Sequence, residues 1–167
     1  MEKILEKMDS YNILNNLFPG VVLDYLFEKM LNIDLVQGSI IENLFLYYFL
    51  GMLISRVGSL IIEPLCRKIR WVKYADYGEY IKACNIDKKV DTLSEVNNSY
   101  RTIFSGFIIT IFAKIYLIIT EKINTSFEFN KFMILLVLTV LFAFAYKKQT
   151  KYVADRVKKV NATEKNN

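Results

Sequence analysis

The chain has 167 residues, of which 53% are hydrophobic and 23% are charged, and its formal net charge is +5. Because no Pro-, Gly- or Ser-rich linker divides it, this length favours one domain that covers residues 1–167. Histidine is absent, and the sequence has no GxSxG, Walker, HExxH or CxxC pattern, which predicts a non-enzymatic protein with no cofactor or bound metal.

The first apolar stretch predicts a helix over residues 14–32 with charges in its interior. Asp24, Glu28 and Lys29 lie within it. Each would cost about 2.5–3.5 kcal/mol at the centre of a membrane helix. The stretch therefore predicts either a spanning helix or an amphipathic helix that is only partly inserted.

The second apolar stretch predicts a helix over residues 40–62, and Pro64 is expected to end or kink it. Small residues recur at spacings of three and four, so they share one face, and the third stretch, residues 102–120, repeats this pattern. Such faces let helices approach closely in lipid. We expect the two helices to pack together, within one chain or between copies. The predicted packing face consists of Gly51, Ser55, Gly58, Ser59 and Gly106.

The segment 64–101 is too polar to span a membrane and predicts a helical hairpin. Asp76 is placed to cap a helix that runs through Cys84, and Asp91 to cap one that continues into the third apolar stretch. Cations and aromatic rings at the start of the segment are typical of the headgroup level. The charged surface is either a solvated face or a docking surface for a soluble partner. The candidate docking residues are Arg67, Arg70, Trp71, Asp76 and Glu79.

The fourth stretch predicts a helix over residues 130–147, which has no charge between Phe132 and Tyr146. Residues 148–167 form a polar tail, and the helix is expected to continue into it for two turns. A helix that is apolar on all sides has no face to show to water, which favours a membrane location.

Basic residues predict the orientation of these helices. Segment 63–101 carries eight Lys and Arg residues and the tail after Tyr146 carries seven, whereas segment 32–39 has none and segment 121–131 has only two. Because Lys and Arg mark the cytoplasmic side, the sequence predicts an all-α polytopic membrane protein with four transmembrane helices and both termini in the cytoplasm. The bases lie beside membrane ends, where they face anionic lipid, so the expected partner is the bilayer and not nucleic acid.

Charges inside the apolar stretches match in predicted depth. Asp24 and Arg56 lie at similar distances from the cytoplasmic ends of their stretches, and Glu28 matches Lys114 in the same way. Buried membrane charges seek partners or a wet cavity. The sequence predicts the pairs Asp24–Arg56 and Glu28–Lys114, either as structural salt bridges or as part of a hydrated path.

The segments YFLGMLISRVGSLIIEP and SEVNNSYR, joined by an aromatic and basic loop, resemble a group of small, mostly uncharacterised four-helix bacterial membrane proteins. The resemblance covers the middle third of the chain. It implies an inner-membrane protein of a low-GC bacterium, encoded beside a soluble partner in some cases, and some small multi-pass proteins of this kind act in anti-phage defence. No motif in it names a chemistry, so no functional residue carries over.

Two functions from different classes follow from these features. The first is a non-enzymatic membrane sensor or effector that forms homo-oligomers and perturbs membrane integrity. The alternative is a membrane anchor or scaffold that recruits a soluble cytoplasmic partner. A small-solute transporter ranks third, because the chain shows no internal repeat and no pair of Gly/Pro-broken helices.

Overall fold

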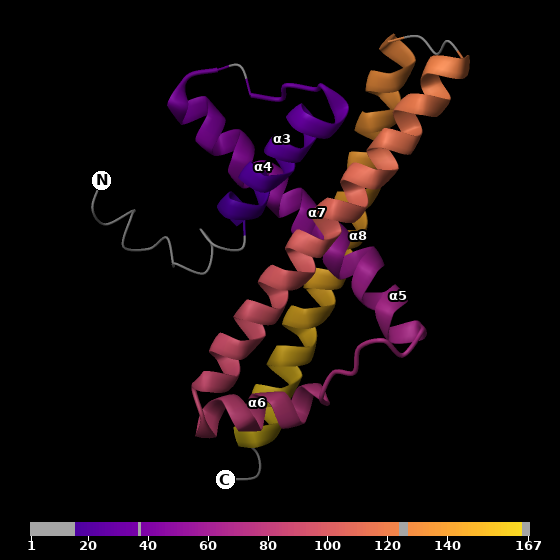
Figure 1. Ribbon diagram of the computed structural model, residues 1–167. Helices are drawn as coiled ribbons and strands as arrows, with labels where there is room; N and C mark the ends of the chain where they lie inside the picture. The colour runs from indigo at the N-terminus through magenta and orange to yellow at the C-terminus, as the bar shows by residue number, and fades with distance from the viewer. Residues whose placement is uncertain (1–15, 37, 124–126, 165–167) are drawn as a thin grey trace. The chain divides into compact units, whose positions relative to one another are not determined.

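The computed structural model describes residues 16–36, 38–123 and 127–164, and within these ranges the chain forms helices and no strands. It divides into two compact units, Met1–Ile123 and Asn124–Asn167. The first unit contains α3 (Phe18–Leu26), the π-helical turn η2 (Phe27–Leu31), α4 (Ile40–Val57), the π-helical turn η3 (Gly58–Ile62), α5 (Glu63–Lys68), α6 (Tyr77–Ile86) and α7 (Lys89–Ile123); the second contains α8 (Phe127–Glu164) (Figure 1).

In the part of the chain that the structure describes, three helices are long and apolar enough to cross a membrane: Ile40–Lys68, Lys89–Ile123 and Phe129–Asp155. They correspond to the second, third and fourth predicted spans. Of the first predicted helix, residues 16–31 are helical and include α3 and η2, which together cover Phe18–Leu31, whereas positions 14 and 15 lie outside the described residues.

α3 and α4 pack as antiparallel neighbours whose backbones touch at two glycines. A Cβ added at Gly20 would lie 1.8 Å from the carbonyl oxygen of Tyr47, and one added at Gly51 would lie 1.6 Å from that of Asn16. Only residues without a side chain permit this approach. The contact fixes the register of the two helices, with Gly20 beside Tyr47 and Asn16 beside Gly51.

The helix that begins at Ile40 continues through Pro64 to Lys68. Ser39 and Glu42 start it with reciprocal hydrogen bonds, in which the Ser39 N–H donates to Glu42 Oε2 at 2.7 Å and the Glu42 N–H donates to Ser39 Oγ at 3.5 Å. Pro64 does not end the helix. The preceding turn η3 is wound with five-residue hydrogen bonds, and the Glu63 N–H donates to the Gly58 carbonyl. This wider turn gives room for the proline ring, which would collide with a carbonyl in a regular α-helix.

α7 packs against α4 and η3 along a seam of small side chains. Ile54, Thr102 and Ser105 are almost completely buried there. A Cβ at Gly106 would lie 3.7 Å from Ile54 Cγ2, an ordinary contact, whereas one at Gly58 would lie 2.7 Å from Ser105 Oγ. The sequence predicted that the second and third apolar helices would pack together, and within this unit they do.

α6 is the short helix that Asp76 was predicted to cap. The Gly78 N–H donates to Asp76 Oδ1 at 2.6 Å, and the helix runs from Tyr77 to Ile86. The predicted role of Asp91 was wrong, because α7 begins at Lys89, whose N–H donates to Asp87 Oδ1 at 2.9 Å. A tight turn therefore joins α6 to α7.

α8, described as a unit by itself, is one helix from Phe127 to Glu164. It continues well beyond the two turns expected after Tyr146. The sequence from Lys147 to Glu164 has no Gly or Pro to stop it and contains five lysines, which favour helix.

Candidate functional site

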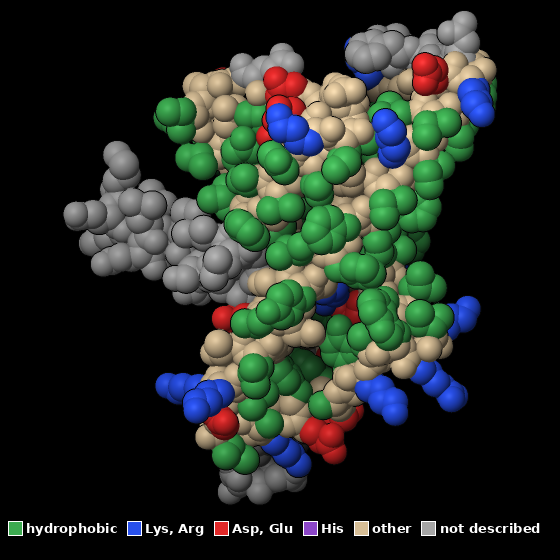
Figure 2. Space-filling view, viewed as in Figure 1, with side chains coloured by type: hydrophobic (Ala, Val, Ile, Leu, Met, Phe, Trp, Pro, Cys, Tyr) green, Lys and Arg blue, Asp and Glu red, His purple; other side chains and the backbone are tan. Residues whose placement is uncertain are grey.

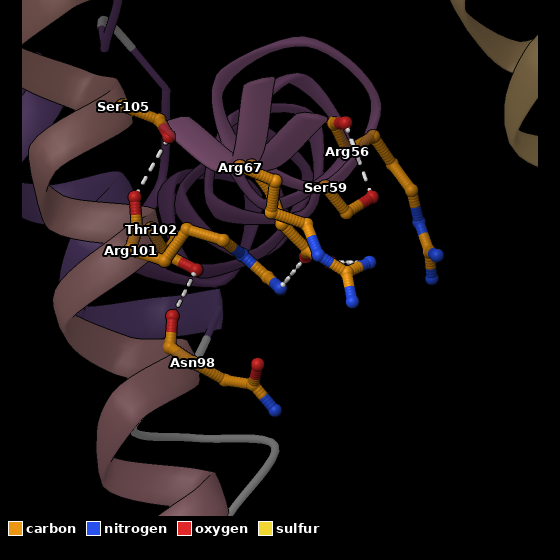
Figure 3. A network of polar contacts seen from close by, with 8 residues as sticks. Arg56, Ser59, Arg67, Asn98, Arg101, Thr102 and Ser105 are labelled. Atoms are coloured by element: carbon orange, nitrogen blue, oxygen red, sulfur yellow. Dashed lines mark hydrogen bonds and ion pairs between the residues drawn. The ribbon is translucent and has the colours of Figure 1, made fainter. Parts of the chain in front are cut away.

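The most buried ionic group that the structure describes joins α5 to α7. Arg101 Nη1 donates to Glu63 Oε2 at 2.6 Å, and the two side chains are only 17% and 11% exposed. Arg67 Nη1 approaches the other carboxylate oxygen, Glu63 Oε1, at 3.7 Å. The Glu63 carboxylate therefore contacts two guanidinium groups, those of Arg101 and Arg67, whose side chains are labelled in Figure 3. The Arg101 Nε is buried without a hydrogen-bond partner, so the Glu63 carboxylate is the main group that offsets the cost of burying the guanidinium charge.

Next to this ion pair, α7 satisfies its buried hydroxyls with its own backbone. Thr102 Oγ1 donates to the Asn98 carbonyl at 2.8 Å and Ser105 Oγ to the Arg101 carbonyl at 2.7 Å (Figure 3). Thr110 Oγ1 donates to the Gly106 carbonyl at 3.0 Å in the same way. Hydroxyls bonded four residues back need no partner on another helix. The seam between α4 and α7 therefore contains polar side chains, but their hydroxyl groups are already bonded within α7.

The two charge pairs predicted from depth are not formed among the described residues. Glu28 Oε1 accepts from Lys29 Nζ at 2.6 Å, and no ion pair joins Asp24 to Arg56. The register of α3 on α4 explains why Asp24 and Arg56 do not pair. Asp24 lies eight residues beyond Asn16 and Arg56 lies five residues beyond Gly51 in the opposite direction, which separates them by about 20 Å along the bundle. Asp24 instead interacts with the Tyr47 hydroxyl.

Lys114 does reach the first helical segment, but through a different atom from the one predicted. Its Nζ donates to the Met30 carbonyl at 3.3 Å. Met30 lies in the last turn of η2, where carbonyl groups lack helical partners and the helix dipole favours a cation. The depth argument therefore placed Lys114 beside the correct element and named the wrong acceptor.

The predicted packing face is divided between two neighbours. Gly51 faces α3, whereas Gly58 and Gly106 lie in the seam between η3 or α4 and α7. Ser55 and Ser59 are half-buried, and Ser59 Oγ donates to the Arg56 carbonyl at 3.3 Å. One continuous stripe in the sequence thus serves two helix contacts.

The predicted docking residues do not share one role. Arg67 stacks on the Tyr74 ring, with 4.7 Å from Cζ to the centroid, and Trp71 packs edge-on against Phe104 at 5.6 Å between centroids. Asp76 is engaged as the helix cap described above. Arg70 and Glu79 are exposed. Arg67 lies in the last turn of α5 and Arg70 and Trp71 in the turn after it, whereas Asp76 caps α6 and Glu79 lies within it.

A second polar cluster lies at the junction of α6 and α7. The Tyr80 hydroxyl donates to Asp91 Oδ1 at 2.8 Å, and the Cys84 thiol donates to the same oxygen at 3.4 Å. The Ser94 hydroxyl acts to lower the phenol's pKa, but burial and the hydrogen bonds to Asp91 and Cys84 prevail and raise the pKa of Tyr80 to about 12. The sequence predicted that Asp91 caps a helix, and the contact with Tyr80 was missed. The one feature of the sequence that pointed to it was the position of Tyr80 and Asp91 on either side of a short turn.

The raised pKa has a consequence for stability. The neutral phenol is favoured in the folded state, so its contribution is complete below pH 10, the ordinary tyrosine value, and is lost as the pH rises to about 12. We expect Tyr80→Phe to lower the free energy of unfolding by about 1 kcal/mol at neutral pH. It should also remove one titration near pH 12 from the phenolate absorbance at 295 nm. Asp91→Asn should move that titration toward pH 10, and an unchanged titration would contradict the assigned contact.

No protein-family model matches the chain, and no curated protein or solved structure matches it either. The resemblance to small four-helix bacterial membrane proteins therefore stays a prediction. The functional proposal below is based on the geometry of the described residues.

Proposed function

We propose that the chain is a non-enzymatic integral membrane sensor or effector in which α7 links a region outside the bilayer to helices inside it. One observation supports this most directly. α7 is unbroken for 35 residues and carries side-chain contacts to other elements at three levels, one in its first turn and two farther along the helix. These contacts are Tyr80–Asp91, Glu63–Arg101 and Lys114 to the Met30 carbonyl.

A helix held in this way moves as a rigid element. A displacement of α6, caused by a ligand or by a change in the membrane, would therefore be passed along α7 to the seam with α4. Such coupling requires that the trigger favour one arrangement of the helices over another. The three contacts are the groups that would differ between the two arrangements.

The effector action we propose requires several copies of the chain. Within the described part of the first unit, the helices are closed against one another: Ile54 and Ser105 are fully buried, and the backbones of α3 and α4 touch. The predicted charge pairs do not line a passage through it. A membrane lesion would then form between chains, so we propose a homo-oligomer.

The proposed topology has four spans with both termini in the cytoplasm, since the lysines and arginines cluster on alternate sides. It is tested with single cysteines in place of Val36, Asn97, Lys122 and Gln149, in a background without Cys66 and Cys84. A membrane-impermeant thiol reagent added to intact cells should label the variants at 36 and 122 and spare those at 97 and 149. Labelling at 122 without labelling at 36 would remove the first span.

The effector role is tested by the membrane potential of cells that overproduce the protein. We expect depolarisation of a dye-reported potential by the native chain. Asn97 is exposed on α7 between the contacts at Asp91 and Arg101, so Asn97→Pro should break the helix there, at about 3 kcal/mol, and abolish depolarisation. Asn97→Ala is the matched control and should depolarise normally. Equal depolarisation by the proline variant, at equal membrane abundance, would contradict coupling through α7.

The alternative is a membrane anchor that recruits a soluble protein, and one observation favours it. Large apolar side chains are exposed at the end of α6 and in the polar first part of α7: Ile86, Leu93 and Tyr100 are 87%, 68% and 70% exposed. Exposed apolar side chains on a polar segment are typical of interaction surfaces. A native chain that leaves the membrane potential unchanged would exclude the effector and favour the anchor.

A further inference from the structure

We infer that the end of α5 and the turn that follows it form a binding site for the phosphate headgroup of an anionic phospholipid. We define this surface, the interfacial turn, as residues 65–74. The inference rests on the membrane location in the proposed function and not on the sensor or effector role.

The charge of the interfacial turn is one-sided. Four of the seven residues from Arg67 to Lys73 are basic, and no acidic residue lies between Pro64 and Ala75. The nearest carboxylate on the preceding helix, Glu63, is taken by Arg101 at 2.6 Å and is farther from Arg67, at 3.7 Å. The interfacial turn therefore has a net positive charge that no carboxylate within it neutralises. Such a surface attracts an anion.

The cations alternate with apolar side chains that are more than half exposed. Leu65, Ile69 and Trp71 are 54%, 64% and 64% exposed. In the region where Figure 1 labels α5, Figure 2 shows Lys and Arg side chains (blue) that project beside hydrophobic side chains (green). A soluble anion would use the charges and leave the apolar groups in water, whereas a phospholipid matches both.

The turn is a defined structure and not a loose loop. The Trp71 N–H donates to the Cys66 carbonyl at 2.9 Å, and Arg70 has φ 58°, the left-handed conformation that usually ends such a helix with glycine. A side chain at this position is disfavoured, so an arginine there points to a role for its guanidinium. The contacts of Arg67 with Tyr74 and of Trp71 with Phe104 fix two more side chains of the site.

Depth agrees with this assignment. The interfacial turn contains the last residues of the apolar helix Ile40–Lys68 and the residues after it, so it lies at one end of a span. Figure 3 shows Arg56 extending from the same side of this helix as Arg67, but Arg56 lies eleven residues earlier, about 16 Å deeper, and is outside the site.

Trp71 is the only tryptophan of the chain, so its fluorescence reports on this site alone. The full-length protein is placed in nanodiscs of mixed phosphatidylglycerol and phosphatidylcholine in which one lipid or the other carries brominated acyl chains. We expect brominated phosphatidylglycerol to quench Trp71 with about tenfold preference, which equals ~1.4 kcal/mol, close to the attraction of one cation to an anionic surface.

The triple variant Arg67→Gln, Arg70→Gln, Lys73→Gln should lose the preference. The control Lys82→Gln, Lys88→Gln, Lys89→Gln removes the same charge from α6 and the turn before α7 and should keep it. Helix content by circular dichroism establishes that both variants are folded, and the variant Arg67→Lys, Arg70→Lys, Lys73→Arg should retain most of the preference if charge is what the lipid recognises.

Three results would overturn the inference. Quenching by neither lipid would place the turn away from the bilayer, as expected for a soluble partner's docking surface. Equal quenching by both lipids would leave no headgroup selectivity. Loss of the preference in millimolar inorganic phosphate would indicate a site for a free anion. None of these results bears on whether the protein depolarises cells, so the two proposals can fail separately.

Discussion

Replacing Gly51 with alanine should lower the free energy of unfolding by about 3 kcal/mol, and Gly20→Ala should have a similar effect. In each case the new Cβ would lie within 2 Å of a backbone carbonyl oxygen on the facing helix. A backbone atom cannot rotate away as a side chain can, so α3 and α4 must separate. The gain of about 1 kcal/mol in helix propensity from Gly to Ala is too small to compensate.

Gly106 provides the matched control on the same bundle. A Cβ there meets Ile54 Cγ2 at 3.7 Å, which is an ordinary contact. We expect Gly106→Ala to be neutral or to stabilise by up to about 1 kcal/mol. The measurement is thermal or SDS-induced unfolding in detergent. Equal behaviour of the three variants would contradict the register of α3 on α4, and with it the reason that Asp24 and Arg56 are apart.

Glu63→Gln should destabilise the first unit by about 3 kcal/mol, because it leaves the Arg101 guanidinium largely buried without a carboxylate. Arg101→Met should cost less, since Arg67 remains near Glu63, at 3.7 Å. The double replacement Glu63→Met, Arg101→Met removes both charges and should recover most of the loss. Unfolding in detergent measures all three variants against the native chain.

An exposed ion pair of the same length supplies the control for this series. Lys29 and Glu28 are joined at 2.6 Å, but their side chains are 52% and 51% exposed. Solvent screens such a pair, so Lys29→Gln should leave the free energy of unfolding nearly unchanged. If the double replacement were as unstable as Glu63→Gln, the contribution of Glu63 would lie in packing and not in charge.

The helices themselves could be predicted from sequence, because apolar runs, caps and helix breakers act over a few residues. The runs that became α4, α7 and α8 were long and apolar, and the cap at Asp76 followed from a single side chain next to a helical segment. The contact between the second and third apolar helices also followed, because small residues at spacings of three and four need a close neighbour. These features depend on local chemistry alone.

The pairing of charges could not be predicted, because it depends on the relative heights of helices. The depth argument placed the start of the first helix at the membrane surface. The structure places Asn16 beside Gly51, well inside α4, and this shift moves Asp24 toward the start of α4 and away from Arg56. Glycine contacts set that height, and their partners were not visible in the sequence.

The Glu63–Arg101 pair was missed for a simpler reason. Both residues stood at the predicted ends of spans, where charges are ordinary, and Arg101 was counted only as a marker of orientation. The same comparison of depth, applied to the ends of adjacent antiparallel helices, would have placed them at one level. It was applied only to charges in the helix interiors.

The turn η3 also bears on how the length of this chain can change in evolution. The buried positions of the long helix are Gly51, Ile54, Gly58, Ile62 and Cys66, and the last three steps are of four residues each. A four-residue step over-rotates an α-helix by about 40°, and the wide turn takes up this excess by holding one additional residue. Loss of one residue between Gly58 and Ile62 would return the segment to ordinary α-helix without moving Gly51 or Ile54, but the Pro64 ring would then collide with a carbonyl of the preceding turn. We therefore expect this residue and Pro64 to be gained or lost together, so the proline marks the one place in the helix interior where its length can change.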